Sequence, residues 1–217
     1  MTLALRNRIA GVLAAALVAA AWSPVTAHAL SFTIDSAGDS QTVNWSLDIG
    51  GGITLSATGT LEALAVSSTT VDLGITITNL MSPSLNERVY SLGFNTDPAV
   101  TAAFLSQGGV FDGLGNDTVF PGFQTIELCA FAAQNCAGGN INQALAGGGT
   151  DSFSLRLTGD FQTPPMLTLD TFAIQFMGDL GSYQFEGNGN STPVPAPAPL
   201  IVLGAGILGM WLIRRRV

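Results

Sequence analysis

Apolar and polar residues alternate over much of this chain, with a period of two. The clearest alternating runs cover residues 43–49, 53–61, 71–78, 153–158 and 170–176. Successive side chains of a strand point to opposite faces, so each run predicts a half-buried antiparallel strand with one wet face. Thr, Val, Ile and Phe dominate these runs, and they pack well on a pleated surface.

Glycine- and proline-rich breaks separate the predicted strands. Gly50-Gly51-Gly52 divides the first two runs and predicts a tight hairpin. The one segment with a helical pattern is Pro98 to Leu105, where a proline opens a turn or two of helix. Seven or eight short strands with such connections predict an all-β fold for residues 30–190, namely an antiparallel, jelly-roll-like β-sandwich.

Residues 1–29 have the pattern of a secretory signal peptide. Arg6 and Arg8 precede an apolar run, and Ala27 and Ala29 frame a small-x-small cleavage site before Leu30. We therefore expect a signal-peptide helix that is handled by the secretion machinery and removed by signal peptidase. The mature body would then lie outside the cytoplasm, in an oxidising setting.

The other end carries a proline-rich linker, an apolar segment and a basic cluster. Prolines alternate with small residues in the linker, residues 191–199, and predict an extended spacer. The segment 200–217 begins with 14 uncharged residues and ends with Arg214, Arg215 and Arg216. A helix of that apolar length spans about 21 Å, and snorkelling arginines help it across the bilayer. This predicts a single C-terminal transmembrane helix with its arginines in the cytosol and the acidic body outside.

These C-terminal elements, in this order, resemble the PEP-CTERM sorting signal of Gram-negative bacteria. The resembling residues are Val194, Pro195, Ala196 and Pro197, then the stretch 203–209, then the arginines. The resemblance implies processing by exosortase, an integral-membrane cysteine transpeptidase that cleaves near the proline motif. It also implies a host that produces exopolysaccharide and forms biofilms. Ala196 stands where the family usually has a glutamate.

The mature body is similar to the cistern family of PEP-CTERM proteins. The similarity rests on the opening Leu30 to Ser40, the turn Gly93 to Pro98, and Phe120 to Thr125 ahead of Cys129. It implies no enzymatic activity, because such proteins lack a characterised biochemical role.

The charges are distributed unevenly between the body and the two ends. The chain has 15 acidic residues, seven arginines, no lysine and one histidine, for a formal net charge of −8. Between residues 30 and 199 only Arg88 and Arg156 oppose all 15 acids, which gives 2 − 15 = −13. A body this acidic repels phosphate backbones, so we expect no nucleic-acid partner.

Cys129 and Cys136 are the only cysteines. In an exported chain such a pair predicts one disulfide, which here would hold a surface loop after a strand at residues 124–128. A redox pair or a metal site is the alternative. A C-x-x-C spacing is absent, however, and the mature body has no histidine to complete a zinc site.

The inventory of catalytic residue types is short. The mature body would have no histidine once His28 is removed with the signal peptide, which excludes catalytic mechanisms that depend on histidine. The chain also has no lysine, which excludes Schiff-base enzymes and P-loop proteins. A pair of carboxylates for glycoside hydrolysis remains conceivable, with the candidates Glu62, Glu87, Glu127 and Glu186. The sequence therefore predicts a protein that is not an enzyme, with no catalytic residue and no cofactor.

Hard oxygen ligands for calcium occur in two places. Asp112, Asn116 and Asp117 lie in a glycine-rich stretch, and Asp35 lies close to Asp39. No D-x-D-x-D-G loop is present, and Asp and Asn also favour turns for their own sake. Both interpretations stay open at this point.

Together these features predict an exported surface or matrix protein with a structural or adhesive role in exopolysaccharide. It would sit in the inner membrane through its C-terminal helix until exosortase acts, and then at the cell surface or outside the cell. The alternative is a carbohydrate- or calcium-binding β-sandwich module at the cell surface. A carboxylate hydrolase is a third class, and it requires two acids in one cleft.

Overall fold

The computed structural model describes residues 30–120 and 125–187, and these form eleven β-strands with no α-helix. The predicted signal peptide, the linker, the sorting motif and the arginine-flanked C-terminal helix lie outside the described residues. The strands are β1 (Ser31–Ile34), β2 (Ser40–Gly50), β3 (Ile53–Val66), β4 (Thr70–Asn79), β5 (Arg88–Asp97), β6 (Thr101–Ser106), β7 (Gly113–Val119), β8 (Thr125–Phe131), β9 (Thr150–Thr158), β10 (Leu167–Gly178) and β11 (Gly181–Glu186).

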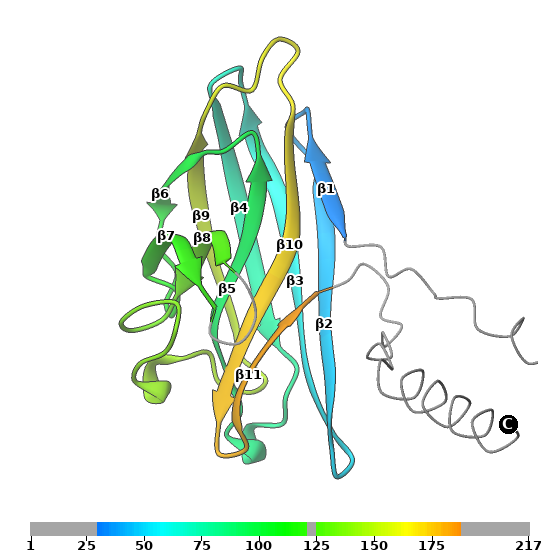
Figure 1. Cartoon of the computed structure of the whole chain (residues 1–217), viewed down its shortest axis with the longest axis vertical. Helices are drawn as coiled ribbons and strands as arrows, with labels where there is room; N and C mark the ends of the chain where they lie inside the picture. Colours follow the sequence, from blue (N-terminus) through cyan, green and yellow to red (C-terminus); the bar gives the residue numbers. More distant parts are fainter. Residues whose placement is uncertain (1–29, 121–124, 188–217) are drawn as a thin grey trace, which may run out of the picture. The chain divides into compact units, whose positions relative to one another are not determined.

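The strands form two antiparallel sheets (Figure 1). Sheet A has six strands in the order β1-β10-β5-β8-β7, with β11 paired to β10 as well. Sheet B has five strands in the order β2-β3-β4-β9-β6. The all-β prediction is confirmed, and the two sheets agree with a β-sandwich.

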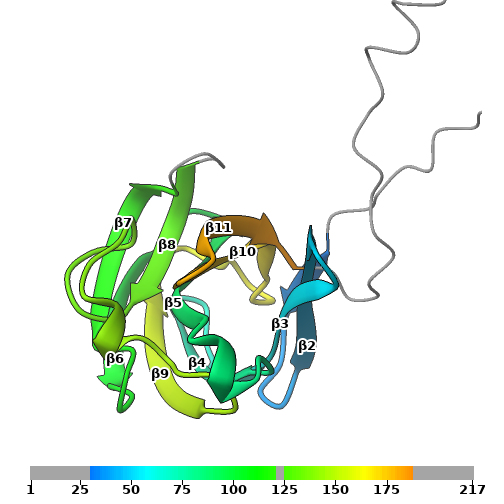
Figure 2. The same cartoon turned by 90° about the horizontal axis from the view of Figure 1, so that it is seen from below.

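The two sheets face each other, as the view from below shows (Figure 2), and buried apolar side chains of both sheets form one core. It is made from the inward-facing positions of both sheets, including the fully buried Leu55, Leu73 and Ile77 of sheet B. Two phenylalanines of β10 enter the core from sheet A. The ring of Phe172 packs on that of Phe94, with centroids 6.2 Å apart. The ring of Phe176 packs on that of Phe185, with centroids 5.8 Å apart. Buried apolar area of this kind supplies most of the folding free energy.

The five alternating runs of the sequence all fall within strands, namely β2, β3, β4, β9 and β10. The predicted hairpin is also confirmed, because β2 and β3 pair on either side of Gly51 and Gly52. Gly50, Gly51 and Gly52 have φ of 86°, 63° and 77°, a region that side chains other than glycine rarely adopt. Three consecutive glycines therefore permit this turn.

The predicted helix at Pro98 to Leu105 is wrong. The chain there forms β6, which pairs with β9 from Thr101 opposite Thr158 to Ser106 opposite Ser154. Eight residues are too few for a helix that is stable without packing, whereas a strand satisfies its backbone groups on the edge of sheet B. Tertiary pairing therefore overrides the local pattern.

Part of sheet A shows no alternation because its strands are buried on both faces there. β5 is the clearest case, because every residue from Val89 to Phe94 is buried. A strand covered on both sides carries no polar face, so its sequence shows no period of two.

Candidate functional site

The outer face of sheet A is covered by the segment 132–146. Ala132 and Ala144 of this segment pack on Tyr90 of β5 and form a small second core. Close packing favours a glycine at position 139, because a Cβ there would collide with the Tyr90 hydroxyl oxygen. The segment covers the part of sheet A around Tyr90, whereas Thr33 of β1 and Thr125 of β8 are exposed.

The predicted disulfide joins Cys129 to Cys136 and fastens the start of this segment. Its location differs from the prediction, because Cys129 lies within β8 and both cysteines are buried. They form a small apolar cluster with Phe120, Ile126 and Ala173. The disulfide therefore joins sheet A to the segment over it and is not on the surface.

Buried polar side chains hold the same segment on the sheet. The Ser91 hydroxyl donates to the carbonyl oxygen of Cys136 and to Oε1 of Gln175, at 3.1 and 3.0 Å. Nε2 of Gln175 donates to the carbonyl oxygen of Ala137 at 3.3 Å. Buried polar groups must be satisfied in this way, so Ser91 and Gln175 have a structural role.

The outer face of sheet B, in contrast, is lined by hydroxyl groups. We call this the hydroxyl face; it consists of Thr58, Thr60, Thr76, Thr78, Thr150, Ser152, Ser154 and Ser106. Cross-strand neighbours on it hydrogen bond to one another, as in the pairs Thr76–Ser152 and Thr78–Thr150, whose hydroxyl oxygens are 2.9 and 2.8 Å apart. None of these residues was among the predicted site residues, although each occupies a polar position of a strand.

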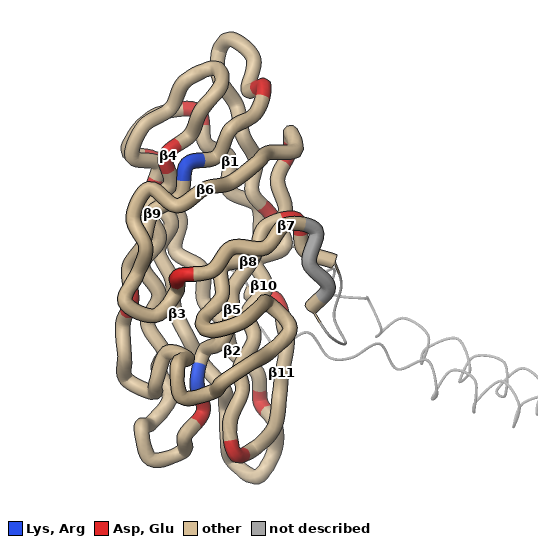
Figure 3. The backbone as a smooth tube through the Cα atoms, turned by 90° about the vertical axis from the view of Figure 1, so that its left-hand side faces the viewer, with Lys and Arg blue, Asp and Glu red and all other residues tan. Residues whose placement is uncertain are grey.

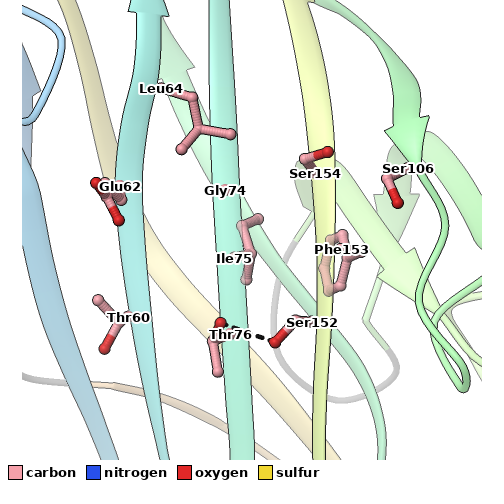
Figure 4. Close-up of a pocket in the computed structure, with 10 residues that line it drawn as sticks. All are labelled: Thr60, Glu62, Leu64, Gly74, Ile75, Thr76, Ser106, Ser152, Phe153 and Ser154. Carbon is pink, nitrogen blue, oxygen red and sulfur yellow. Dashed lines mark hydrogen bonds between the residues drawn. The ribbon is translucent and has the colours of Figure 1, made fainter.

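A hollow of about 320 Å³ lies on the hydroxyl face, over β3, β4, β9 and β6 (Figure 4). Two cross-strand rows lie beneath it. One row is Thr60, Thr76 and Ser152, and the other is Glu62, Gly74, Ser154 and Ser106. The space above Gly74, in the middle of the second row, is taken by the side chain of Leu64.

Leu64 forms an apolar border of the hollow. Its side chain is 51% exposed and leans over the neighbouring strand, since a Cβ on Gly74 would lie 3.3 Å from Leu64 Cδ2. A register shift between Ala63 and Ala65 places Leu64 at this point. The hollow thus combines hydroxyl groups, one exposed apolar side chain and the carboxylate of Glu62.

The structure does not bring the four candidate carboxylates together. Glu62 is the only one of them that lines the hollow, and its carboxylate has no hydrogen bond or ion pair within the described residues. Glu127 accepts hydrogen bonds from the backbone N–H and the hydroxyl of Thr96, at 2.7 and 2.9 Å. Glu87 is fully buried, and one of its oxygens accepts the N–H of Leu180 at 2.8 Å.

Glu186, the fourth candidate, lies near Asp170 at the edge of β10. Burial raises the pKa of the Glu186 carboxyl, and the negative charge of Asp170 raises it further. Its Oε1 is buried without a hydrogen-bond partner in the described part of the chain. This carboxyl therefore favours its neutral form more than an ordinary glutamate does.

The calcium candidates do not form one site. Asn116 and Asp117 lie within β7 rather than in a loop, and Asp112 immediately precedes that strand. Asp112 and Asn116 are four residues apart on an extended chain, roughly 13 Å. The carboxylate of Asp39 is used locally, because it accepts the N–H groups of Asp35 and Ser36 at 3.0 and 2.9 Å. These two hydrogen bonds lower the pKa of Asp39.

The remaining charges are spread over the body, as Figure 3 shows. Arg156 forms the single ion pair among residues 30–120 and 125–187, a two-pronged contact with Asp72 at 2.8 and 2.7 Å. The same residues contain no group of three or more His, Cys, Asp or Glu arranged to hold a metal ion. They also contain no helix of the length and apolar character that a membrane span needs.

Comparison with known proteins finds no family model that matches this chain, and no curated protein or solved structure that matches it.

Proposed function

We propose that this chain is an exported, non-enzymatic surface or matrix protein that exosortase sorts through its C-terminal signal. The observation that carries the proposal is the order of elements at the end of the chain: the motif Val194 to Pro197, an apolar segment, and Arg214 to Arg216. A signal-peptide pattern at the other end accompanies it. The chain would be held in the inner membrane until processing and would then act in the exopolysaccharide matrix.

The fold is compatible with a structural or adhesive role outside the cell. The body is a sandwich with a buried disulfide, and disulfides are typical of exported proteins. From β4 to β10 the chain passes repeatedly from one sheet to the other, with β7–β8 as the only hairpin in between. This alternation supports our further proposal that the sandwich is of the jelly-roll type.

Deletion of residues 194–217 tests the sorting proposal. We expect the full chain in the membrane fraction before processing, and the truncated chain to pass into the medium. A chain with lysine in place of Arg214, Arg215 and Arg216 is the matched control, because it keeps the positive charge that sets orientation. Identical locations for the full and truncated chains would refute the proposal, as would a mature C-terminus, measured by mass spectrometry, that still includes Val217 at the cell surface.

The second candidate function is a carbohydrate-binding module. The hollow on the hydroxyl face favours it, because binding sites for small molecules are concave and combine apolar contacts with a few polar groups. A calcium-binding module has less support. The carboxylate of Asp39 already accepts two backbone N–H groups of its own turn. Asp112 and Asn116 are too far apart along the extended chain to share one ion.

A further inference from the structure

We infer that the hollow on the hydroxyl face binds a neutral glycan chain, with Glu62 and Leu64 as its principal contacts. This inference deepens the second candidate function and names the class of ligand. It rests on the composition of the hollow, on the charge of the body and on the direction of the two rows beneath it.

The composition of the hollow suits a sugar. A pyranose ring presents hydroxyl groups at its edge and C–H groups on its faces, so it needs both hydrogen-bonding and apolar contacts. Thr60, Thr76 and Ser152 supply hydroxyls, and the exposed Leu64 supplies the apolar contact. The volume of about 320 Å³ is at the lower end of the range, roughly 300–1,000 Å³, of pockets that hold small ligands.

Glu62 is the strongest hydrogen-bond acceptor in the hollow. Its two carboxylate oxygens have no partner among the described residues, whereas the acids that serve the fold accept backbone N–H groups, as Glu127 and Asp39 do. A carboxylate can accept hydrogen bonds from two adjacent hydroxyls of a sugar, and such charge-assisted bonds are stronger than neutral ones.

Charge selects a neutral ligand over an acidic one. No arginine lines the hollow, and the nearest cation on this face, Arg156, is already paired with Asp72. Because the body between residues 30 and 199 carries a net charge of −13, an acidic glycan would be repelled before it reached the sheet.

The two cross-strand rows beneath the hollow suit a glycan of several sugars rather than a single sugar. The row of Glu62, Gly74, Ser154 and Ser106 crosses four neighbouring strands. Neighbouring strands are about 4.8 Å apart, so the row is roughly 14 Å long. A glycan lying across the strands would contact several of these positions at once, with the Leu64 side chain over Gly74 as the apolar contact at the centre.

Calorimetric titration of the full chain with four polymers tests this inference. The chain is kept in a polyoxyethylene detergent, because sugar-headed detergents would compete. The probes are a soluble β-glucan and a galactomannan, both neutral, with acidic polygalacturonate and cationic chitosan. We expect at least one neutral glycan to bind, with an affinity that does not change with salt because the ligand is uncharged.

Variants locate the site. Glu62→Ala and Leu64→Ser remove exposed side chains, and we expect each to weaken binding about tenfold, the loss that one charge-assisted hydrogen bond or a comparable apolar contact produces. Thr76→Ala and Thr78→Ala form a matched pair, because each removes a hydroxyl of β4 that is bonded to β9. Only Thr76 lies in the hollow, so only Thr76→Ala should weaken binding.

Several outcomes would overturn the inference: no binding of either neutral glycan, tighter binding of polygalacturonate, tighter binding of chitosan that persists at high salt, or equal effects of Thr76→Ala and Thr78→Ala. Melting temperatures of all variants are measured alongside, so that unfolding is not mistaken for lost binding. The result is independent of the sorting experiment, because purified protein can bind a glycan whether or not exosortase processes it in the cell.

Discussion

The carboxylate of Asp151 accepts the backbone N–H of Phe111 at a distance of 2.9 Å. The same carboxylate also accepts the N–H groups of Gly109 and Val110, at 2.8 and 3.0 Å. Asp151 is only 8% exposed, so these three donors replace water around a buried charge. The contact holds the loop before β7 against β9 and places the ring of Phe111 on that of Phe153, with centroids 5.6 Å apart.

Asp151→Ala should lower the free energy of unfolding by about 2–4 kcal/mol. The substitution leaves three backbone N–H groups without their acceptor, and each such group is costly when buried. Urea denaturation of the full chain measures the change. Asp112→Ala, an exposed acid at the other end of the same loop, is the control and should stay within about 0.5 kcal/mol of the natural chain. Equal effects of the two substitutions would contradict the role of Asp151.

Removal of the disulfide should cost about 2.5 kcal/mol. The bond closes a loop of eight residues, since the cysteines are seven positions apart, and the chain-entropy relation gives about this value for such a loop. The double variant Cys129→Ala with Cys136→Ala tests this by urea denaturation with and without reductant. Reductant should destabilise the natural chain and leave the double variant unchanged. A natural chain that is insensitive to reductant even when unfolded would argue against the bond.

The ion pair between Asp72 and Arg156 should make a small, pH-dependent contribution. The hydrogen bonds from Arg156 lower the pKa of Asp72. The stabilisation is therefore fully present above the unfolded value of about 3.9 and is lost as the pH falls through the lower folded value. Because the pair is exposed, we expect Arg156→Gln to have only a small effect on the free energy of unfolding at neutral pH and low salt.

Stability curves of the natural chain and Arg156→Gln should converge as the pH falls below the lowered pKa of Asp72 in the folded natural chain, because Asp72 is then protonated in both. They should also converge at high salt, which screens an exposed pair. A difference that persists at low pH would show that Arg156 stabilises the fold through packing of its side chain instead.

Glu186→Gln should stabilise the protein at neutral pH by a few tenths of a kcal/mol (roughly 0.5), because it removes the charge from a partly buried carboxyl whose Oε1 lacks a hydrogen-bond donor. The folded-state pKa of Glu186 is raised above 4.5 by burial and by Asp170. The natural chain therefore loses stability as the pH rises from the ordinary glutamate value through the raised one. Melting temperatures between pH 4 and 7 should show this loss in the natural chain and a weaker one in Glu186→Gln.

Asp170→Asn provides the companion measurement. It removes the second cause of the raised pKa but leaves Glu186 buried, so the pH-dependent loss should become smaller without disappearing. If neither substitution changes the pH dependence, Glu186 is not the group responsible for it.

The sequence alone determined the class of fold and the strands that have one wet face. Alternation identifies β2, β3, β4 and β9 because each of these strands has an inward apolar set, such as Leu55 and Ala57 of β3, separated by polar residues. It also finds β10, although residues 172–176 of that strand are buried on both faces. The sequence also predicted the disulfide between the two cysteines, which the structure contains, whereas the signal peptide and the C-terminal helix stay predictions.

Only the tertiary structure decided which positions from different strands meet. Glu62, Gly74, Ser154 and Ser106 are brought into one row by strand register, and a shift of one residue would turn a strand's side chains to the other face. The cover over sheet A, which buries Cys129 and both faces of β5, likewise depends on contacts distant in sequence. Local patterns specify a strand's faces, whereas its neighbours are set by packing across the whole body.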